Sequence, residues 1–189
     1  MRFEVKDRDV AGRLARFEVN GRRLETPALL PVINPNDPVV PPREIDRMGF
    51  DGVITNAYII RKHEHLRREA LERGVHGLLD FDGFVMTDSG SFQLAEYGDV
   101  DVTNREIVRF QARIGSDVGT ILDIPTPPDA PRNRAERDVE TTVKRAREAV
   151  SLDERPPLAL TVQGSTYEEL RRECAERLAE LPASIYPIG

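Results

Sequence analysis

Asp88, Asp123 and Gln163 each directly follow a short, mainly apolar run of the chain. Each run has the length and composition of a buried strand. A carboxylate can attack an electrophilic carbon or transfer a proton, and a carboxylate or an amide can bind the polar edge of a planar base. These three residues are therefore the first candidates for a binding or catalytic site. The runs that precede them are residues 84–87, 118–122 and 158–162.

Small residues after Asp88 allow a ligand to come close to it. Ser89 and Gly90 offer little steric hindrance to a carboxylate that projects into a pocket, and Gly90 lets the backbone approach a flat ligand. Phe92 can stack on the face of such a ligand. The same residues also fit an ordinary turn after a strand, where Asp, Ser and Gly are common. The recurrence of a polar residue after two further strands favours a functional site.

The intervals between Asp88, Asp123 and Gln163 are each long enough for a loop, a helix and a return to the sheet. Parallel strands joined in this way end at the same edge of the sheet. We therefore expect the three side chains to line a common hollow at the carboxyl ends of neighbouring strands.

The composition is that of a folded protein without a strong electrostatic signature. Its 189 residues, with 39% hydrophobic content, can bury the core of one domain. The net charge of −6, from 33 acidic and 27 basic residues, neither indicates nor excludes nucleic-acid binding. The single Cys174 can form no internal disulfide, the first residues are charged, and no apolar run approaches the roughly 18 residues of a membrane span. These features predict a cytoplasmic protein without membrane association.

Residues 1–27 are expected to form an antiparallel β-hairpin. Asn20-Gly21 is the dipeptide that most readily forms a two-residue hairpin turn, and apolar and charged residues flank it on both sides. A charged helix is expected to end at Gly74. The hairpin strands are predicted over residues 13–18 and 22–26, further strands over 28–32 and 52–56, and helices over 43–48 and 58–72.

The second half of the chain contains signals for three more helices. A first helix is expected to end at Gly115, and apolar residues at spacings of three and four predict a second, amphipathic helix over residues 132–150. The apolar stripe of the third includes Cys174, which we interpret as a core residue rather than a nucleophile. Capping boxes are expected for the first and third helices, formed by Thr103 with Glu106 and by Thr166 with Glu169.

The alternation of strands and helices predicts an α/β fold, an incomplete TIM (β/α)8-type barrel of about five to six βα units with an N-terminal β-hairpin. Residues 28–189 would contain the βα units, with a sixth strand starting near residues 184–186. A complete barrel has eight units and about 250 residues, and its active site lies at the carboxyl rim of its strands. The chain is therefore expected to be one partial catalytic barrel domain without the last third of the barrel.

Four motifs in this order resemble those of the tRNA-guanine transglycosylases, and within them the archaeal, archaeosine-forming branch. Residues 86–94, Met-Thr-Asp-Ser-Gly-Ser-Phe-Gln-Leu, are similar to the catalytic motif of the family, and Ser91 is the archaeal form. The resemblance covers essentially the whole chain. The second and third motifs are matched by residues 122–131 and 162–165, and residues 186–189 match the beginning of the fourth.

The resemblance implies an enzyme of the pentosyltransferase class that breaks a guanosine N-glycosidic bond in tRNA and installs a 7-deazaguanine base. For the archaeal branch it implies exchange of the D-loop guanine at position 15 for 7-cyano-7-deazaguanine, the precursor of archaeosine. One carboxylate attacks the anomeric carbon and a second transfers protons, as in retaining glycosidases. The implied binding partners are tRNA and the 7-deazaguanine base.

The same resemblance implies roles for individual residues. Asp88 matches one of the two catalytic aspartates of the family, for which both nucleophilic and acid-base roles have been assigned. Asp123 matches the residue that accepts hydrogen bonds from the Watson-Crick edge of the base, and Gln163 is expected at the other edge. Phe92 is expected to stack on the ring. Further candidates for substrate contact are Ser89, Gly90 and Asn56.

Several features of the family have no counterpart in this sequence. They are the second catalytic aspartate, the zinc ligands Cys-x-Cys-x-x-Cys with a distant His, and the archaeal RNA-binding domains. We assign no metal ligands, since His63, His65 and His76 form no convergent set, and zinc is expected only in the complete family enzyme. The chain is therefore expected to be a fragment or one half of a split enzyme, whose barrel a C-terminal half or a homologous subunit completes.

Other functions fit parts of the sequence. A non-catalytic subunit that binds tRNA or the base and partners an active homologue would keep the fold but would not need Asp88. A barrel enzyme acting on sugar phosphates would need a Gly-rich phosphate loop, and the sequence contains none. The helix over residues 132–150 mixes acidic and basic residues, which favours a solvated face over an RNA interface.

Overall fold

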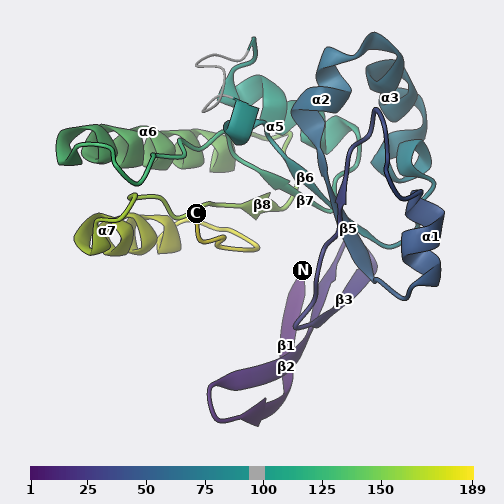
Figure 1. Ribbon diagram of the computed structural model, residues 1–189, viewed down its shortest axis with the longest axis horizontal. Helices are drawn as coiled ribbons and strands as arrows, with labels where there is room; N and C mark the ends of the chain where they lie inside the picture. Colours follow the sequence, from purple (N-terminus) through teal and green to yellow (C-terminus); the bar gives the residue numbers. More distant parts are fainter. Residues whose placement is uncertain (94–100) are drawn as a thin grey trace.

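The structure is a computed structural model that describes residues 1–93 and 101–189, so Leu94 of the first motif lies outside the described residues (Figure 1). Two sheets and several helices make up the described fold. The antiparallel sheet contains β1 (Arg2–Asp9), β2 (Gly12–Val19) and β3 (Arg22–Thr26). The parallel sheet contains β4 (Val32–Ile33), β5 (Gly52–Asn56), β6 (Phe84–Asp88), β7 (Val118–Thr120) and β8 (Leu158–Ala159). The helices are α1 (Pro42–Arg47), α2 (Ala57–Lys62), α3 (Glu64–Leu79), α5 (Asn104–Arg113), α6 (Arg132–Val150) and α7 (Glu168–Ala179).

The five parallel strands lie side by side in chain order, and each connection between them carries at least one helix. A further parallel pairing continues the sheet beyond β8, where Ala159 pairs with Ile185 and Val162 with Ile188. The predicted α/β class is therefore confirmed, and these isolated parallel bridges begin where the sequence predicts the start of a sixth strand.

Alternate residues of the strands point to opposite faces of the parallel sheet. Val53 and Val85 face an apolar core that α2, α3 and α5 cover. Phe84 and Met86 face the antiparallel sheet, where the ring of Phe84 meets that of Phe17 edge-on at 5.9 Å between centroids. The antiparallel sheet forms the arm in the lower half of Figure 1. It thus covers the parallel sheet near the start of β6, at the opposite end of that strand from Asp88.

The predicted hairpin is confirmed, but it is part of a larger sheet. Asn20 and Gly21 both have positive φ angles, 50° and 78°, as a tight hairpin turn between β2 and β3 requires. The sequence patterns do not predict β1, which pairs antiparallel with β2. Its two apolar residues, Phe3 and Val5, alternate with charged ones, so the charge of the segment hides the strand period.

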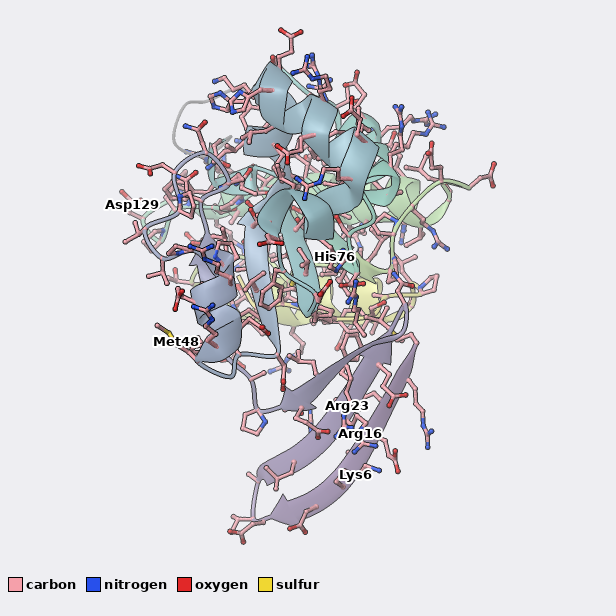
Figure 2. All side chains as sticks on the ribbon, turned by 90° about the vertical axis from the view of Figure 1, so that its right-hand side faces the viewer. Lys6, Arg16, Arg23, Met48, His76 and Asp129 are labelled. Carbon is pink, nitrogen blue, oxygen red and sulfur yellow. The ribbon has the colours of Figure 1, made fainter. Side chains whose placement is uncertain are left out.

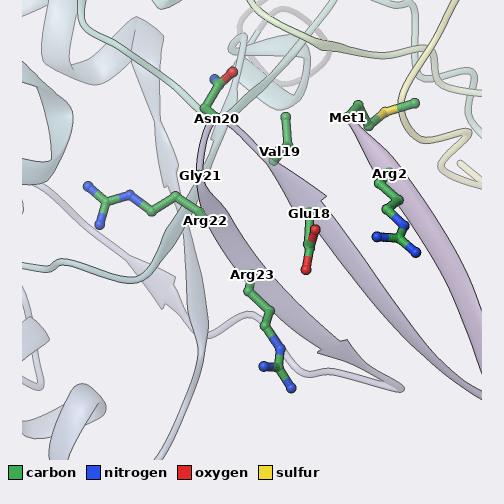
Figure 3. A pocket seen from close by; sticks show the side chains of 8 residues that line it. All are labelled: Met1, Arg2, Glu18, Val19, Asn20, Gly21, Arg22 and Arg23. Carbon is green, nitrogen blue, oxygen red and sulfur yellow. The ribbon is translucent and has the colours of Figure 1, made fainter.

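Charged side chains of opposite sign alternate on the exposed face of the antiparallel sheet. Figure 3 shows Glu18 between Arg2 and Arg23, its partners on the two neighbouring strands. Arg16 and Arg23 form ion pairs with the same glutamate of β3. Figure 2 shows Lys6, Arg16 and Arg23 together on this face. Because acidic residues lie among these cations, the face has no single-sign patch that would suit nucleic acid.

The predicted helix over residues 58–72 is in fact two helices. The extended backbone of His63, with ψ at 116°, separates α2 from α3. Asn56 starts α2, since its Oδ1 accepts a hydrogen bond from the backbone N–H of Ile59 at 2.9 Å. Gly74 has non-helical backbone angles, φ 74° and ψ 169°, so the charged helix ends there as predicted, and a second helical segment within α3 follows it to Leu79.

One strand boundary and one capping box differ from those predicted. Of the strand expected over residues 28–32, only Val32 belongs to β4, since the preceding proline has no N–H to donate. The second capping box does not form, because the hydroxyl of Thr166 donates instead to the Pro128 carbonyl at 3.3 Å. The first capping box, the helix over residues 132–150 and the burial of Cys174 are confirmed.

Buried polar side chains hold β6 and β7 in register. The amide of Gln111 accepts hydrogen bonds from Thr87 Oγ1 and the Thr120 N–H and donates to the Thr120 carbonyl, at 2.8 to 2.9 Å. The Oδ2 atom of Asp117 accepts from the Val85 N–H and contacts His76 Nε2, both at 2.9 Å. These bonds fix the two strands whose carboxyl ends carry the candidate site.

Candidate active site

The predicted site residues lie at the carboxyl ends of β5 to β8. Asn56 and Asp88 end β5 and β6, and the two residues are direct partners in the sheet register. Asp123 and Gln163 follow β7 and β8 within a few residues. The order of the strands therefore brings these polar groups to one rim, as their sequence positions predict.

Asp88 is half-buried and held by two donors on one oxygen. Its Oδ2 atom accepts hydrogen bonds from Asn56 Nδ2 at 3.0 Å and from the backbone N–H of Gly90 at 3.2 Å. Asn56 Nδ2 also donates to Gln93 Oε1 at 3.0 Å, while its Oδ1 caps α2. Since every polar atom of the Asn56 amide is engaged, Asp88 is fixed in one orientation at the rim.

Asp123 is almost completely buried and is bound on both oxygens. Ser91 Oγ donates to its Oδ1 at 2.7 Å, and Gln163 Nε2 donates to its Oδ2 at 2.6 Å. The carboxylate and the amide that were predicted to contact a base thus contact each other. Each carboxylate oxygen has two lone pairs, so Asp123 can still accept hydrogen bonds from a ligand.

Ser89, a predicted substrate contact, lies in the interior of the protein. Its side chain is fully buried, and its Oγ donates to the Ile121 carbonyl at 2.7 Å. Its backbone N–H donates to Thr120 Oγ1 at 2.8 Å. Ser89 Oγ also lies 3.1 Å from Ser91 Oγ, which in turn binds Asp123. Ser89 therefore ties the segment after β6 to β7 and supports Asp123 through Ser91.

Burial raises the pKa of both carboxyl groups. For Asp88, burial is the main cause, the Gly90 N–H opposes it, and the charge of Asp123 adds to it. For Asp123, burial again raises the pKa, and the hydrogen bonds from Ser91 and Gln163 oppose it. Two carboxyl groups at one rim whose pKa values are both raised are typical of sites that handle protons or bind polar ligands.

Phe92 is the predicted site residue that the fold leaves most open. Its side chain is 65% exposed at the rim, two residues beyond Gly90. The ring is therefore accessible to a stacking ligand. Gly90 itself has a φ of 97° and lies against Tyr58, so its lack of a side chain serves the packing of this turn.

Three residues that the sequence does not single out as site residues support Asp123 from nearby. Ser91 binds it directly. Thr120 and Gln111 fix the end of the strand that precedes it. Ser91 could have been found from its place in the first motif, but the buried bonds of Thr120 and Gln111 follow only from the fold.

Arg145 differs from the solvated helix face that the sequence predicts for α6, because it reaches the backbone next to Asp123. Its Nη1 donates to the Leu122 carbonyl at 2.6 Å, and its charge favours the ionised form of Asp123. Asn104 completes this support, since its Oδ1 accepts from the Leu122 N–H at 3.0 Å and its Nδ2 donates to the Arg145 carbonyl at 3.0 Å. Two helices therefore hold the backbone that carries Asp123.

The loop after Asp123 is bound to the segment after Gln163. Ser165 Oγ donates to the Pro127 carbonyl at 2.8 Å, and Tyr167 OH donates to the Ala130 carbonyl at 3.0 Å. The second and third motifs thus form one connected surface beside the buried carboxylate.

The described residues give no evidence of a metal centre or a membrane segment. Within residues 1–93 and 101–189, no group of three or more His, Cys, Asp or Glu side chains is placed to hold a metal ion. His76 contacts Asp117, away from the rim residues. None of the helices in the described part of the chain is long and apolar enough to cross a membrane.

Replacing Gly90 by Ala is expected to destabilise the protein and disturb the site. The new Cβ would lie 2.6 Å from Tyr58 Cβ, and the φ of 97° is strained for alanine. We expect the free energy of unfolding to fall by about 2 kcal/mol or more, as measured by urea denaturation. Gly21→Ala is the matched control, because Gly21 also has a positive φ but nothing lies within 4 Å of its Cβ position. Equal losses in the two variants would show that contact with Tyr58 imposes no constraint.

Comparisons with known proteins give a consistent result over nearly the whole chain. Residues 8–189 match the family model described as queuine tRNA-ribosyltransferase. A tRNA-guanine(15) transglycosylase from Methanopyrus kandleri is 83% identical over 187 residues, which are 99% of this chain and 41% of that protein. Proteins of the same name from Pyrococcus furiosus and Methanosarcina barkeri are 58% and 50% identical, and the aligned region is 32% and 38% of their lengths. The chain therefore spans about a third to two fifths of these curated relatives.

Proposed function

The chain belongs to the queuine tRNA-ribosyltransferase family, and on that premise we propose that it contributes the catalytic rim of a tRNA-guanine transglycosylase. The proposed reaction exchanges the D-loop guanine at position 15 of tRNA for 7-cyano-7-deazaguanine, the precursor of archaeosine. The relatives are named for guanine 15. The observation that carries the proposal is the meeting of the half-buried Asp88 carboxyl group, the buried Asp123 carboxyl group and the Gln163 amide at a single rim.

Asp123 and Gln163 are proposed to recognise the base. A guanine-like ring presents an N1–H and an exocyclic amine on one edge, and an acceptor-only carboxylate is complementary to both. The free lone pairs of Asp123 Oδ1 and Oδ2 can accept these donors while Ser91 and Gln163 keep the carboxylate in place. Gln163 Oε1 can accept a further donor from the ring, and the exposed Phe92 can stack on its face.

Asp88 is proposed to be the main catalytic group. In the first half of the reaction a carboxylate attacks C1′ of the ribose, the C1′–N9 bond breaks, and the departing guanine takes up a proton. In the second half the incoming base gives up its N9 proton and attacks C1′, which releases the carboxylate. One N-glycosidic bond replaces another, so the exchange needs no further reactant. Asn56 and the Gly90 N–H hold the reacting carboxylate at the rim.

The rest of the barrel is proposed to come from outside residues 1–189. Val32 in β4, at one edge of the parallel sheet, is 81% exposed, and Val39 nearby is 96% exposed. These side chains line an apolar hollow of about 430 Å³ with Ile45 and Met48, and Figure 2 shows Met48 at the surface. A C-terminal half or a homologous subunit that completes a TIM-type barrel would cover this edge. A second catalytic carboxylate and the zinc site of the complete enzyme are proposed to lie in that part. We also propose that the activity is cytoplasmic, since tRNA is the substrate.

The function is tested by incorporation of labelled guanine into tRNA. The chain assembled with the part that completes the barrel is expected to label tRNA at position 15 and to leave a tRNA with adenine 15 unlabelled. Unlabelled 7-cyano-7-deazaguanine should compete with the labelled guanine. An assembled, folded complex that labels no tRNA would rule out the proposed activity. Labelling of guanine 15 and of other guanines alike would rule out the positional assignment.

A further inference from the structure

A second, polar hollow lies beside the catalytic carboxylate. It has a volume of about 340 Å³, and part of the loop after β4, the α2 helix and the residue that separates α2 from α3 line it. Figure 1 shows this loop rising beside α2 and α3, on the same side as the carboxyl ends of the parallel strands. The lining residues are Asn34, Asn36, Tyr58, Ile59, Lys62, His63 and Gln93.

Hydrogen bonds connect this hollow to the reacting group. Gln93 forms part of its wall, and its Oε1 accepts from Asn56 Nδ2 at 3.0 Å. The same Nδ2 donates to Asp88 Oδ2 at 3.0 Å. The side chains of Gln93 and Asn56 thus connect the wall of the hollow to Asp88. An RNA strand whose reacting ribose lies on Asp88 must therefore place an adjacent nucleotide close to this hollow.

The chemistry of the lining suits an anionic, hydroxyl-rich group. Lys62 supplies a cation, whose Nζ lies 5.8 Å from the centroid of the Tyr58 ring, and His63 supplies a ring nitrogen. Tyr58 is fixed by a hydrogen bond from its OH to Asp101 Oδ1 at 3.0 Å, which keeps its ring below the lysine. Among the residues that the structure describes, no acidic side chain lines the hollow. Asn34 and Asn36 add amide donors and acceptors of the kind that bind ribose hydroxyls.

We infer that this hollow, defined by Lys62, His63, Asn34 and Asn36, binds the ribose-phosphate of a nucleotide adjacent to the exchanged guanosine. This inference rests on the proposed function, because it takes tRNA as the substrate held at Asp88. Lys62 contacts the phosphate, and the two asparagines contact the sugar. The hollow holds the RNA strand next to the reacting nucleotide and takes no part in the chemistry.

The test uses Lys62→Gln and His63→Gln in the chain assembled with the part that completes the barrel. Affinity for tRNA, measured by filter binding at several salt concentrations, is expected to fall about fivefold to tenfold for Lys62→Gln. The slope of log affinity against log salt is expected to decrease by about one, as for one lost phosphate contact. His63→Gln should weaken binding less and change the slope little. The KM for free labelled guanine and the turnover at saturating tRNA should not change.

Matched controls use the same substitutions elsewhere. Lys144→Gln on the exposed side of α6 and His65→Gln, two residues from His63 but outside the hollow, should bind tRNA like the unchanged protein. An unchanged tRNA affinity and salt slope in Lys62→Gln would overturn the inference, as would a loss of turnover at saturating tRNA without a loss of affinity. The binding readout needs no turnover. An unchanged protein that binds tRNA but exchanges no base would therefore refute the proposed function separately.

Discussion

Asp88→Asn is expected to slow base exchange by at least about a thousandfold without unfolding the protein. Asparagine has the same shape as aspartate and can still accept the hydrogen bonds from Asn56 and the Gly90 N–H through its carbonyl oxygen. It has no anionic oxygen to attack C1′ and no group that can give or take a proton at the rim. The loss therefore falls on turnover rather than on the fold.

The measurement is the single-turnover rate of labelled guanine incorporation at saturating tRNA, with tRNA affinity and melting temperature recorded for each protein. Asp82→Asn is the matched control, because Asp82 is exposed near the opposite end of β6. This control is expected to keep the full rate. Equal rates in Asp88→Asn and the unchanged protein would favour the alternative function, a non-catalytic subunit that binds tRNA or the base beside an active homologue.

A covalent intermediate distinguishes the two roles that Asp88 can have. If Asp88 is the nucleophile, a ribosyl-enzyme trapped on denaturing gels from the unchanged protein is absent from Asp88→Asn. If Asp88 instead transfers protons, the adduct still forms slowly, because another carboxylate attacks C1′. The raised pKa of Asp88, which burial causes, is compatible with either role. The adduct, rather than the pKa, therefore decides the assignment.

Local signals in the sequence predict the elements that depend on local physics. The Thr103–Glu106 capping box, the Asn20-Gly21 turn and the apolar period over residues 132–150 each involve residues within a few positions of one another, and all three are confirmed. The common rim of Asp88 and Asp123 was also predictable, because successive parallel strands end at the same edge of a sheet.

Contacts between distant segments explain what the sequence does not predict. β1 pairs with β2, where Arg2 lies opposite Glu18 and Glu4 opposite Arg16, and no local pattern in the sequence predicts this pairing. Ser91 binds Asp123 across 32 positions, and Gln163 binds it across 40. Arg145 looks like part of a charged helix face, but it reaches the end of β7 because α6 packs there. In each case the fold decides the role of the side chain.

Asp123→Asn is expected to weaken base recognition strongly while making the protein more stable at neutral pH. The side chain is only 5% exposed, and burial raises its pKa above the ordinary value of 3.8. The buried charge therefore opposes folding wherever Asp123 is ionised. Asparagine removes that charge, keeps the hydrogen bond from Ser91, and can pair with Gln163 if the Gln163 amide turns over. We expect a gain on the order of 1 kcal/mol in the free energy of unfolding at pH 7.5.

The pH dependence follows from the sign of the shift. Because the pKa of Asp123 is higher in the folded than in the unfolded protein, the folded state takes up a proton first as the pH falls. The stabilisation that this proton provides is fully present below pH 3.8 and is lost as the pH rises through the folded pKa. The advantage of Asp123→Asn over the unchanged protein should therefore be largest near neutral pH and should shrink as the pH approaches 4. Urea denaturation at pH 7.5 and pH 4.5 measures the difference.

The same change from carboxylate to amide that stabilises the fold is expected to weaken binding of the base. The amide that replaces the Asp123 carboxylate would offer one acceptor and direct a donor toward the N–H groups of the guanine edge, so one hydrogen bond to a charged group is lost and a repulsion is gained. We expect kcat/KM for labelled guanine to fall by about 10² to 10³-fold, with tRNA affinity unchanged. Asp82→Asn should change neither quantity. Full affinity of the Asp123→Asn protein for guanine would show that this carboxylate does not bind the base. A loss of stability at pH 7.5 would instead show that its hydrogen bonds outweigh the burial of its charge.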